Sequence, residues 1–260
     1  MKNTIIYLTS RVIKIIANAL KIACYIFHFF FPGKRLTIPS HSGPLYQAGS
    51  RKAIPKIIWQ TNYTNRVTLA VYLNYLFNRL MTPDYEYRFM TTADREEFIK
   101  TNYPHNILEN YSKLQIGAAQ ADFWRVLVLQ KHGGIYLDID AHFIWPPSSL
   151  IEPQHEDLYI TIRRGDISNY FIASKNNNPL LDEIINLIMD NIDKNELKNV
   201  YDLTGPGVFN SVLDKNIVNT IQYRHICNQG NFTNEYFQYI DKAEGKWTKA
   251  QNHIDIIKDK

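Results

Sequence analysis

The chain has 260 residues, 45% of them hydrophobic, with 29 Lys and Arg against 25 Asp and Glu. Its hydrophobic content is near the globular average, so it can bury a full core in one ordinary domain with an appendage. The two cysteines, Cys24 and Cys227, lie in very different contexts, which excludes a disulfide framework and fits a reducing compartment.

Positive charge is concentrated at the N-terminal end. The first acidic residue is Asp84, and 11 Lys and Arg residues precede it. This asymmetry predicts an anionic partner for the N-terminal part. No DNA- or RNA-binding motif accompanies the charge, so we expect no nucleic-acid partner.

Residues 5–31 are apolar but interrupted by Arg11, Lys14 and Lys21. The charge-free stretch from Ile22 to Phe31 is shorter than the roughly 20 apolar residues of a spanning helix. A basic amphipathic helix with aromatic residues is typical of the interface of an anionic leaflet. The alternative is a helix packed on the catalytic domain or on an oligomer partner.

We therefore expect three parts: a membrane-associating helix at 1–35, a linker at 36–53 and a catalytic domain at 54–250. The abundance of Ile, Asn, Lys and Tyr indicates an AT-rich bacterial genome. Together these features predict a peripheral protein on the cytoplasmic face of a bacterial membrane.

After the linker, strand and helix patterns alternate. Strands are expected at 54–59, 86–90, 158–162 and 170–173, and helices at 66–80, 91–103, 122–132 and 179–192. Such alternation is typical of an α/β fold with a mostly parallel central sheet. In these sheets ligands bind at the carboxyl ends of the strands.

Residues 133–140 read Gly-Gly-Ile-Tyr-Leu-Asp-Ile-Asp, which predicts a turn, a buried strand and two carboxylates at the strand's end. Asp138 and Asp140 are two residues apart, so they point to the same face of an extended strand. Hard cations such as Mg²⁺ and Mn²⁺ share their ligand shell between carboxylates and substrate phosphates. The pair could hold a metal–diphosphate, although an Asp-x-Asp alone is also compatible with a solvated strand end.

The helix before the two glycines carries Asp122 and Arg125, which are three residues apart and share a face. Helix, tight turn and strand should bring a carboxylate, a guanidinium and the Asp pair into one neighbourhood. The alternative for Asp122 and Arg125 is an ion pair on the helix surface, which would contribute little.

Five segments stand in a recognisable order: Ile54–Thr61, Ala121–Arg125, Gly133–Asp140, Asn169–Ser174 and Thr204–Gly207. In these segments the chain resembles glycosyltransferase family 32, the sugar-transferring enzymes with an Asp-x-Asp region, which are distantly similar to the large glucosylating toxins. The resemblance covers about Ile54 to Trp247. It implies the GT-A nucleotide-diphosphate-binding fold and metal-dependent, retaining sugar transfer.

The resemblance also implies partners and a cofactor. The donor would be a UDP- or GDP-sugar, the acceptor a glycan or a lipid-linked molecule of surface polysaccharide biosynthesis, and the cofactor Mn²⁺ or Mg²⁺. Asp138 and Asp140 would bind the metal. Asp241 stands where the family has a histidine, which makes it the candidate third ligand.

Further roles come from the same resemblance. Trp59 would stack on the nucleobase, and Asp122, Arg125 and Asn169 would bind ribose, phosphate or sugar hydroxyls. Trp247 would close over the donor on a flap. Asp138, Asp140 and Arg125 are the expected catalytic group. The alternatives are a core tryptophan at 59, an ordinary loop residue at 169 and an anchored tail at 247.

Two other functions remain open. Ala121 and Lys246 replace serines that the family usually has, which is compatible with an inactive sugar-binding or membrane scaffold. A metal-dependent phosphohydrolase could also use an Asp pair. Haloacid-type phosphatases, however, carry Thr after an N-terminal Asp-x-Asp, whereas Ala141 and His142 follow this pair in mid-chain.

Overall fold

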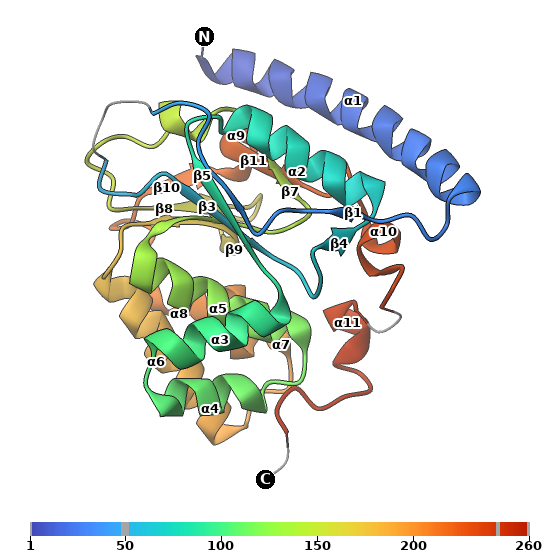
Figure 1. Ribbon diagram of the computed structural model, residues 1–260. Coiled ribbons are helices and arrows are strands. Elements are labelled where there is room, and N and C mark those ends of the chain that lie inside the picture. The colour runs from blue at the N-terminus through green and yellow to red at the C-terminus, as the bar shows by residue number, and fades with distance from the viewer. Residues whose placement is uncertain (1, 48–51, 243–244, 259–260) are drawn as a thin grey trace.

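A sheet between two layers of helices forms the body of the protein in a computed structural model, which describes residues 2–47, 52–242 and 245–258 (Figure 1). In spatial order the strands of this sheet are β10 (Thr220–Gln222), β8 (Asp157–Thr161), β9 (Ile167–Ser174), β6 (Gly134–Leu137), β3 (Ile57–Thr61), β5 (Glu86–Met90) and β2 (His41–Ser42). Strand β6, which leads to the Asp pair, is therefore central.

Most strands of this sheet share one direction. β3 pairs in parallel with both β5 and β6, and β10 pairs in parallel with β8. β9 runs antiparallel to β6 and β8, and the edge strand β2 runs antiparallel to β5. The predicted α/β fold with a mostly parallel sheet is confirmed.

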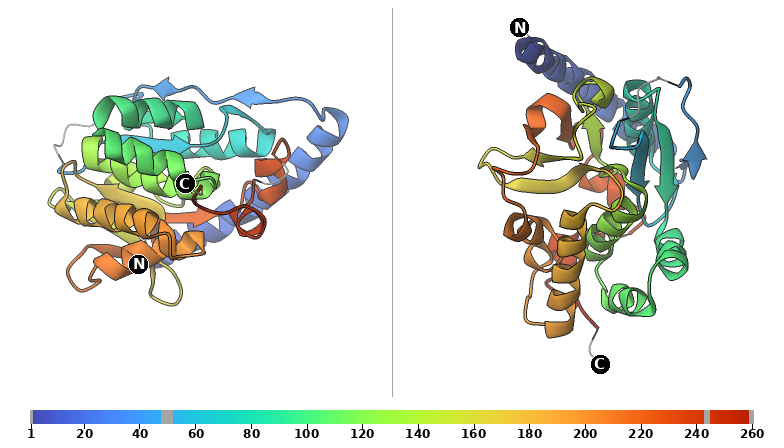
Figure 2. Two further views of the ribbon diagram at one scale, coloured as in Figure 1. Left: turned by 90° about the horizontal axis from the view of Figure 1, so that it is seen from below. Right: turned by 90° about the vertical axis from the view of Figure 1, so that its left-hand side faces the viewer.

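Helices cover both faces of the sheet (Figures 1 and 2). One face carries α1 (Lys2–Phe30), α2 (Leu69–Met81), α9 (Tyr223–Ile226) and the two-stranded sheet of β7 (Ala141–Phe143) and β11 (Cys227–Gln229). The other carries α3 (Thr92–Asn102), α4 (His105–Lys113), α5 (Gly117–His132), α6 (Pro179–Lys194), α7 (Val200–Leu203) and α8 (Pro206–Val212). The remaining elements are β1 (Leu36–Thr37), β4 (Arg66–Val67), the 3₁₀-helix Pro147–Ser149, α10 (Glu235–Tyr239) and α11 (Trp247–Ala250).

Strand residues alternate between two hydrophobic cores, as the pleat requires. Ile58 and Ile135 belong to the core shared with α2, and their neighbours Trp59 and Tyr136 belong to the core shared with α5. Helix α5 lies between the sheet and α6, and every residue from Asp122 to Gln130 is buried. The sequence predicted one buried face for this helix, and the structure buries it all round.

The two glycines between α5 and β6 are required by their backbone conformation. Gly133 and Gly134 have φ of +66° and +109°, where a side chain is strained. A Cβ on Gly133 would lie 2.7 Å from the Asn176 nitrogen, and one on Gly134 would lie 2.7 Å from the Ile57 oxygen. The turn that the glycine pair predicted is therefore present, and it brings β6 directly against β3.

Helix α1 runs along the outside of the α2 layer and has two different faces (Figures 1 and 2). Its inner face buries Ile6, Ile13, Ala17 and Cys24 against residues such as Phe232 and Phe237. Lys21, expected to face an anionic surface, instead donates a hydrogen bond of 3.0 Å to the Gly230 carbonyl.

The segment predicted as a linker, residues 36–53, contributes β1 and β2, and β2 extends the main sheet beside β5. Residues 48–51 of this segment lie outside the described part of the chain.

Candidate active site

The loop that carries the Asp pair leaves the carboxyl end of β6 and is held by buried amides. The Asn74 Nδ2 donates to the carbonyls of Ile139 and Ala141 at 2.8 and 2.9 Å. Asn78 donates to the Ala141 carbonyl and accepts from the Phe143 nitrogen, and the Gln60 Nε2 donates to the Asp138 carbonyl at 3.0 Å. These bonds fix the backbone of Asp138 and Asp140 from the side of α2 and β3.

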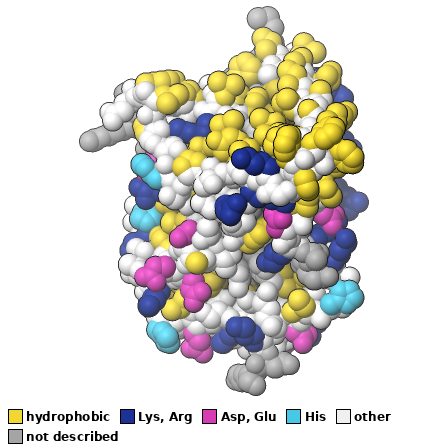
Figure 3. Space-filling model, turned by 45° about the vertical axis from the view of Figure 1, so that its right-hand side comes forward, with side chains coloured by type: hydrophobic (Ala, Val, Ile, Leu, Met, Phe, Trp, Pro, Cys, Tyr) yellow, Lys and Arg dark blue, Asp and Glu magenta, His cyan; other side chains and the backbone are white. Residues whose placement is uncertain are grey.

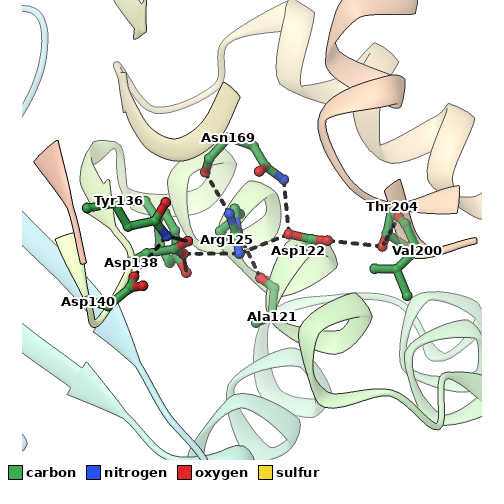
Figure 4. Close-up of polar contacts among 10 residues, drawn as sticks. Ala121, Asp122, Arg125, Tyr136, Asp138, Asp140, Asn169, Val200 and Thr204 are labelled. Carbon is green, nitrogen blue, oxygen red and sulfur yellow. Dashed lines mark hydrogen bonds and ion pairs between the residues drawn. The ribbon is translucent and has the colours of Figure 1, made fainter. Parts of the chain in front are cut away.

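Arg125 joins the helix to the loop (Figure 4). Its Nη2 lies 2.9 Å from the Asp122 Oδ1 and 3.3 Å from the Asp138 Oδ1, and its Nη1 donates to the Asn169 carbonyl at 2.6 Å. Its guanidinium carbon lies 4.3 Å from the centre of the Tyr136 ring. Burial lowers the pKa of this guanidinium, but Tyr136 and the surrounding carboxylates raise it above its usual value. Arg125 is therefore a permanent cation that positions two carboxylates.

Asp122 is buried among hydrogen-bond donors. The Asn169 Nδ2 donates to its Oδ1 at 2.9 Å, and the Thr204 hydroxyl donates to its Oδ2 at 3.3 Å. Burial raises the pKa of Asp122 to about 6, although Arg125 works against this shift. The predicted neighbourhood of Asp122, Arg125, Asn169 and the Asp pair is therefore a single bonded network.

Asp138 and Asp140 crowd each other. Burial and the charge of Asp138 raise the pKa of Asp140 to about 6. The Gln229 Nε2 lies between the pair, 2.9 Å from the Asp140 Oδ1 and 3.3 Å from the Asp138 Oδ2, and the Tyr136 hydroxyl donates to the Asp138 Oδ1 at 2.6 Å. Two close carboxylates with only an amide between them fit a hard divalent cation, which would relieve their repulsion.

A cavity of about 610 Å³ opens above the pair. Its lining comes from the amino-terminal part of α5, the loop after β6, the start of β9, the segment 229–239 and the segment from Gly245 to Trp247. It includes Asp122, Arg125, Asp138, Asp140, Asn169 and Trp247, so six of the predicted site residues meet there. Trp247 also packs against the core, which gives the C-terminal segment an anchor beside the cavity.

Helix α1 supports one wall of this cavity. Besides the contact of Lys21 with Gly230, the Asn228 Nδ2 donates to the Ser10 hydroxyl at 3.0 Å, and Asn234 bonds the Tyr25 hydroxyl at 2.6 Å. Gln229 lies within this wall. The inner face of α1 is therefore structural, as the packed-helix alternative proposed.

Trp59 does not reach the cavity. Its side chain is completely buried, its Nε1 donates to the Gly133 carbonyl at 2.9 Å, and its ring stacks on His132 at 5.6 Å between centroids. This position agrees with the alternative of a core tryptophan and not with the base-stacking prediction, which needs a ring that reaches the cavity. The aromatic residue of this region that does line the cavity is Tyr63, beyond the end of β3.

We expect Trp59→Phe to destabilise the protein by about 1–3 kcal/mol, because the buried Gly133 carbonyl loses its donor. Nucleotide affinity should stay unchanged, since the ring lies outside the cavity. Chemical denaturation and calorimetric titration measure the two effects. Weakened nucleotide binding at wild-type stability would restore the stacking role.

Asp241 is not placed as a third metal ligand. Both of its carboxylate oxygens accept from Arg35 at 2.6 Å, and Asp241 does not line the cavity. Within the described ranges, no group of three or more His, Cys, Asp or Glu side chains could hold a metal ion. Of the predicted set of Asp138, Asp140 and Asp241, the structure therefore brings only the first two together.

The sequence did not reveal several residues that shape the site: Gln60, Asn74, Asn78, Tyr136 and Gln229. Asn74 and Asn78 are four residues apart on the inner face of α2, where a polar pair interrupts the apolar pattern. That interruption was an available signal. Gln229 had none, because it follows the Asp pair by about 90 residues and reaches it only through the pairing of β11 with β7.

Comparison with known proteins agrees with this geometry. Residues 70–157 match the family described as the glycosyltransferase sugar-binding region containing the DXD motif. This segment includes Asp122, Arg125 and the Asp pair. This segment of the chain is therefore similar to that sugar-binding region, and the predicted resemblance is confirmed.

Curated relatives include inositol phosphoceramide mannosyltransferase 3 of Schizosaccharomyces pombe, 41% identical over 34% of this chain and 25% of that protein. The initiation-specific alpha-1,6-mannosyltransferase of Candida albicans is 25% identical over 74% of this chain and 62% of that protein. The chain thus spans less than two thirds of the length of these two relatives. Among solved structures, the PaToxG glycosyltransferase aligns with a TM-score of 0.52 and 20% identity over 82% of this chain and 79% of that chain, which confirms the fold.

Proposed function

We propose that this chain, which in residues 70–157 is similar to the sugar-binding region of DXD glycosyltransferases, is a metal-dependent, retaining glycosyltransferase. It transfers a sugar from a UDP- or GDP-sugar to a glycan or lipid-linked acceptor, in the synthesis of surface polysaccharide. Its catalytic domain comprises residues 54–250, preceded by the linker 36–53 and the membrane-associating helix within 1–35.

The observation that carries this proposal is the placement of Asp138 and Asp140. Both lie at the carboxyl end of a central strand and line the cavity of about 610 Å³, with Arg125 fixed behind Asp138. Ligands of α/β sheets bind at such strand ends. Asp138 already accepts a hydrogen bond from Tyr136 and pairs with Arg125. A carboxylate held in this way suits a metal ligand better than the nucleophile of a phosphohydrolase, which must be free to attack.

Asp138 and Asp140 would hold Mn²⁺ or Mg²⁺, which when bound supplies positive charge to the departing nucleoside diphosphate. The chain's own groups orient this site: Arg125 and Tyr136 fix Asp138, and the Gln229 amide contacts both carboxylates. Asp122 and Asn169, locked by their mutual hydrogen bond, present polar atoms to the cavity for sugar or ribose hydroxyls. Trp247 and its segment cover one side and would limit the access of water to an activated sugar.

Hydrolysis of UDP- and GDP-sugars with added Mn²⁺ tests the proposal, after a thermal-shift screen has identified the donor that stabilises the protein. A transferase releases nucleoside diphosphate slowly in the absence of acceptor, and the release requires metal. An inactive scaffold would bind the donor without turnover, which would contradict the proposed activity.

The acceptor is proposed to lie at an anionic membrane, because α1 exposes an apolar outer face (Figure 3). The exposed large hydrophobic residues of α1 are Ile5, Tyr7, Leu8, Val12, Ile15, Ile16, Leu20, Ile22, Tyr25, Ile26, Phe29 and Phe30. Thr4–Phe30 is long and apolar enough to cross a bilayer by length and composition. Its inner face, however, is engaged with the domain, which favours a helix lying on the membrane. One relative is named for transfer to inositol phosphoceramide, which supports a lipid acceptor.

The membrane proposal predicts that the full chain pellets with phosphatidylserine liposomes and is released by about 1 M salt, which screens surface attraction. Phe29 and Phe30 are exposed by 80% and 67%. Replacing both by serine should weaken liposome binding at least about tenfold, because each aromatic ring contributes more than 1 kcal/mol when buried.

Ile217→Ser is the matched control, since Ile217 is 79% exposed but lies before β10 and not on α1. It should bind liposomes as the wild type does. Equal pelleting of all three proteins would contradict a membrane contact through α1.

A further inference from the structure

Arg95 is a buried cation in the cavity that forms no ion pair with a carboxylate of the described residues. It lies in the first turns of α3, where the Thr91–Asp94 capping box fixes the start of the helix, and only 3% of its surface is exposed. Its Nη2 donates to the Thr92 hydroxyl at 3.0 Å, while its Nε has no hydrogen-bond partner. Burying an uncompensated guanidinium is costly, and an anionic ligand in the cavity would compensate its charge.

A second cation faces the same cavity from the C-terminal segment. Lys242 lines the cavity, and its Nζ lies 3.7 Å from where a Cβ on Gly117 would stand. Burial and the charge of Arg95 both lower the pKa of Lys242, so the two cations are near enough to repel each other. An anion between them would remove that repulsion.

The other cavity cations are already neutralised. Arg125 is paired with Asp122 and Asp138, and Lys246 is paired with Glu235 at 2.7 Å. In the chain as described, neither Arg95 nor Lys242 has an ion pair with any carboxylate. Among the described residues that line the cavity, positive charge without a carboxylate partner is therefore confined to these two.

The amino terminus of α5 adds to this end of the cavity. Gly117 and Ala118, the first two residues of the helix, line the cavity, and the N-cap residue Ile116 offers no side-chain hydrogen bond. The first backbone N–H groups of a helix are free donors at the positive end of its dipole and bind anions such as phosphate. Gly117 has no side chain that could cover them.

We propose that Arg95, Lys242 and the amino terminus of α5 form a phosphate-binding subsite that is distinct from the Asp pair. Its ligand is a phosphate ester, carried either by the donor diphosphate or by the acceptor. The subsite deepens the proposed function, on which it rests, because a phosphate held there without the metal makes the cavity select anionic substrates.

Calorimetric titration of the full chain with pyrophosphate in the presence of EDTA tests the subsite without the metal. Arg95→Met should weaken binding at least about tenfold, since a charge-assisted bond to phosphate is lost, and Lys242→Met should weaken it by a smaller factor. Arg95→Lys should recover part of the affinity, which separates loss of charge from loss of fold. Lys100→Met removes an exposed charge from the same helix and should have no effect.

A second titration identifies which molecule carries the phosphate. If the donor does, UDP or GDP with Mn²⁺ displaces pyrophosphate, and Arg95→Met weakens binding of the nucleotide. If the acceptor does, pyrophosphate still binds at saturating nucleotide, and Arg95→Met leaves nucleotide affinity unchanged. Either result supports the subsite.

Two results would overturn the subsite: no binding of pyrophosphate by the wild type, or equal affinity in Arg95→Met, Lys242→Met and Lys100→Met. Failure of the proposed function is distinguished by Asp140→Asn, which should abolish binding of Mn²⁺ but retain metal-free binding of pyrophosphate.

Discussion

Asp140→Asn is expected to lower metal-dependent turnover of the nucleotide sugar at least about 10³-fold. A metal that stabilises the leaving diphosphate contributes several kcal/mol to the transition state, and each 1.36 kcal/mol is about tenfold in rate. Asparagine keeps the shape of the side chain but removes the charge that a divalent cation needs. The loss should appear in the nucleotide-sugar hydrolysis assay and in direct titration with Mn²⁺.

The same substitution should leave the metal-free fold intact or make it more stable. Burial and Asp138 raise the pKa of Asp140 to about 6, so its charged form is unfavourable in the folded chain. Removing this charge removes a repulsion at neutral pH. Thermal unfolding in EDTA should therefore show a melting temperature at or above that of the wild type.

Asp166→Asn is the matched control, because Asp166 is exposed, pairs with Lys215 and lies outside the cavity. It should leave both turnover and Mn²⁺ affinity unchanged. In the wild type, Mn²⁺ affinity should fall as the pH drops below about 6, since protons compete for Asp140. Undiminished turnover in folded Asp140→Asn would refute the metal site.

The central part of the site could be predicted because it is local in sequence. Asp122 and Arg125 lie on one helix, the glycine pair forms the turn after it, and Asp138 directly follows the next strand. The structure brings them together as expected. The turn at Gly133 and Gly134 could also be predicted from the residue type, because glycine adopts positive φ angles without strain.

The predictions for Trp59, Asp241 and Lys21 do not agree with the structure. The contacts that position Asp241 and Lys21 are made by residues distant in sequence. Trp59 lies on a strand that is covered on both faces, so its pattern did not show whether the ring points to the core or to a ligand. Asp241 accepts hydrogen bonds from Arg35, which lies about 200 residues away in the sequence. Lys21 was predicted to face an anionic surface. Its hydrogen-bond acceptor, the Gly230 carbonyl in the cavity wall, is about 200 residues away and could not be recognised from the sequence.

The second large effect is expected for Arg125→Met. This substitution keeps much of the apolar length of the side chain but leaves Asp122 buried without its cation. Removing one partner of a buried ion pair typically costs about 3–5 kcal/mol. The guanidinium also holds Asp138, so the variant should lose metal–nucleotide affinity together with stability. Denaturant unfolding and calorimetric titration measure the two losses.

A pH series distinguishes this electrostatic cost from a packing defect. In the folded wild type the pKa of Asp122 is raised to about 6, above the value of about 3.9 for an unfolded chain. The folded state then binds more protons, so this residue's contribution to stability falls as the pH rises from about 4 to about 6. Without Arg125 the pKa rises further, which extends the fall to higher pH. The destabilisation by Arg125→Met should therefore be larger at pH 8 than at pH 5.

The double variant Asp122→Asn with Arg125→Met completes the test, because it removes the buried charge together with its partner. We expect it to recover part of the stability at pH 8 and to lose the pH dependence of the single variant. Metal–nucleotide binding should stay weak, since Asp138 still lacks the cation that positions it. A destabilisation that is equal at both pH values and unchanged in the double variant would show that Arg125 acts through packing alone. The network of Asp122, Arg125 and Asp138 would then not be the element that links helix α5 to the catalytic loop.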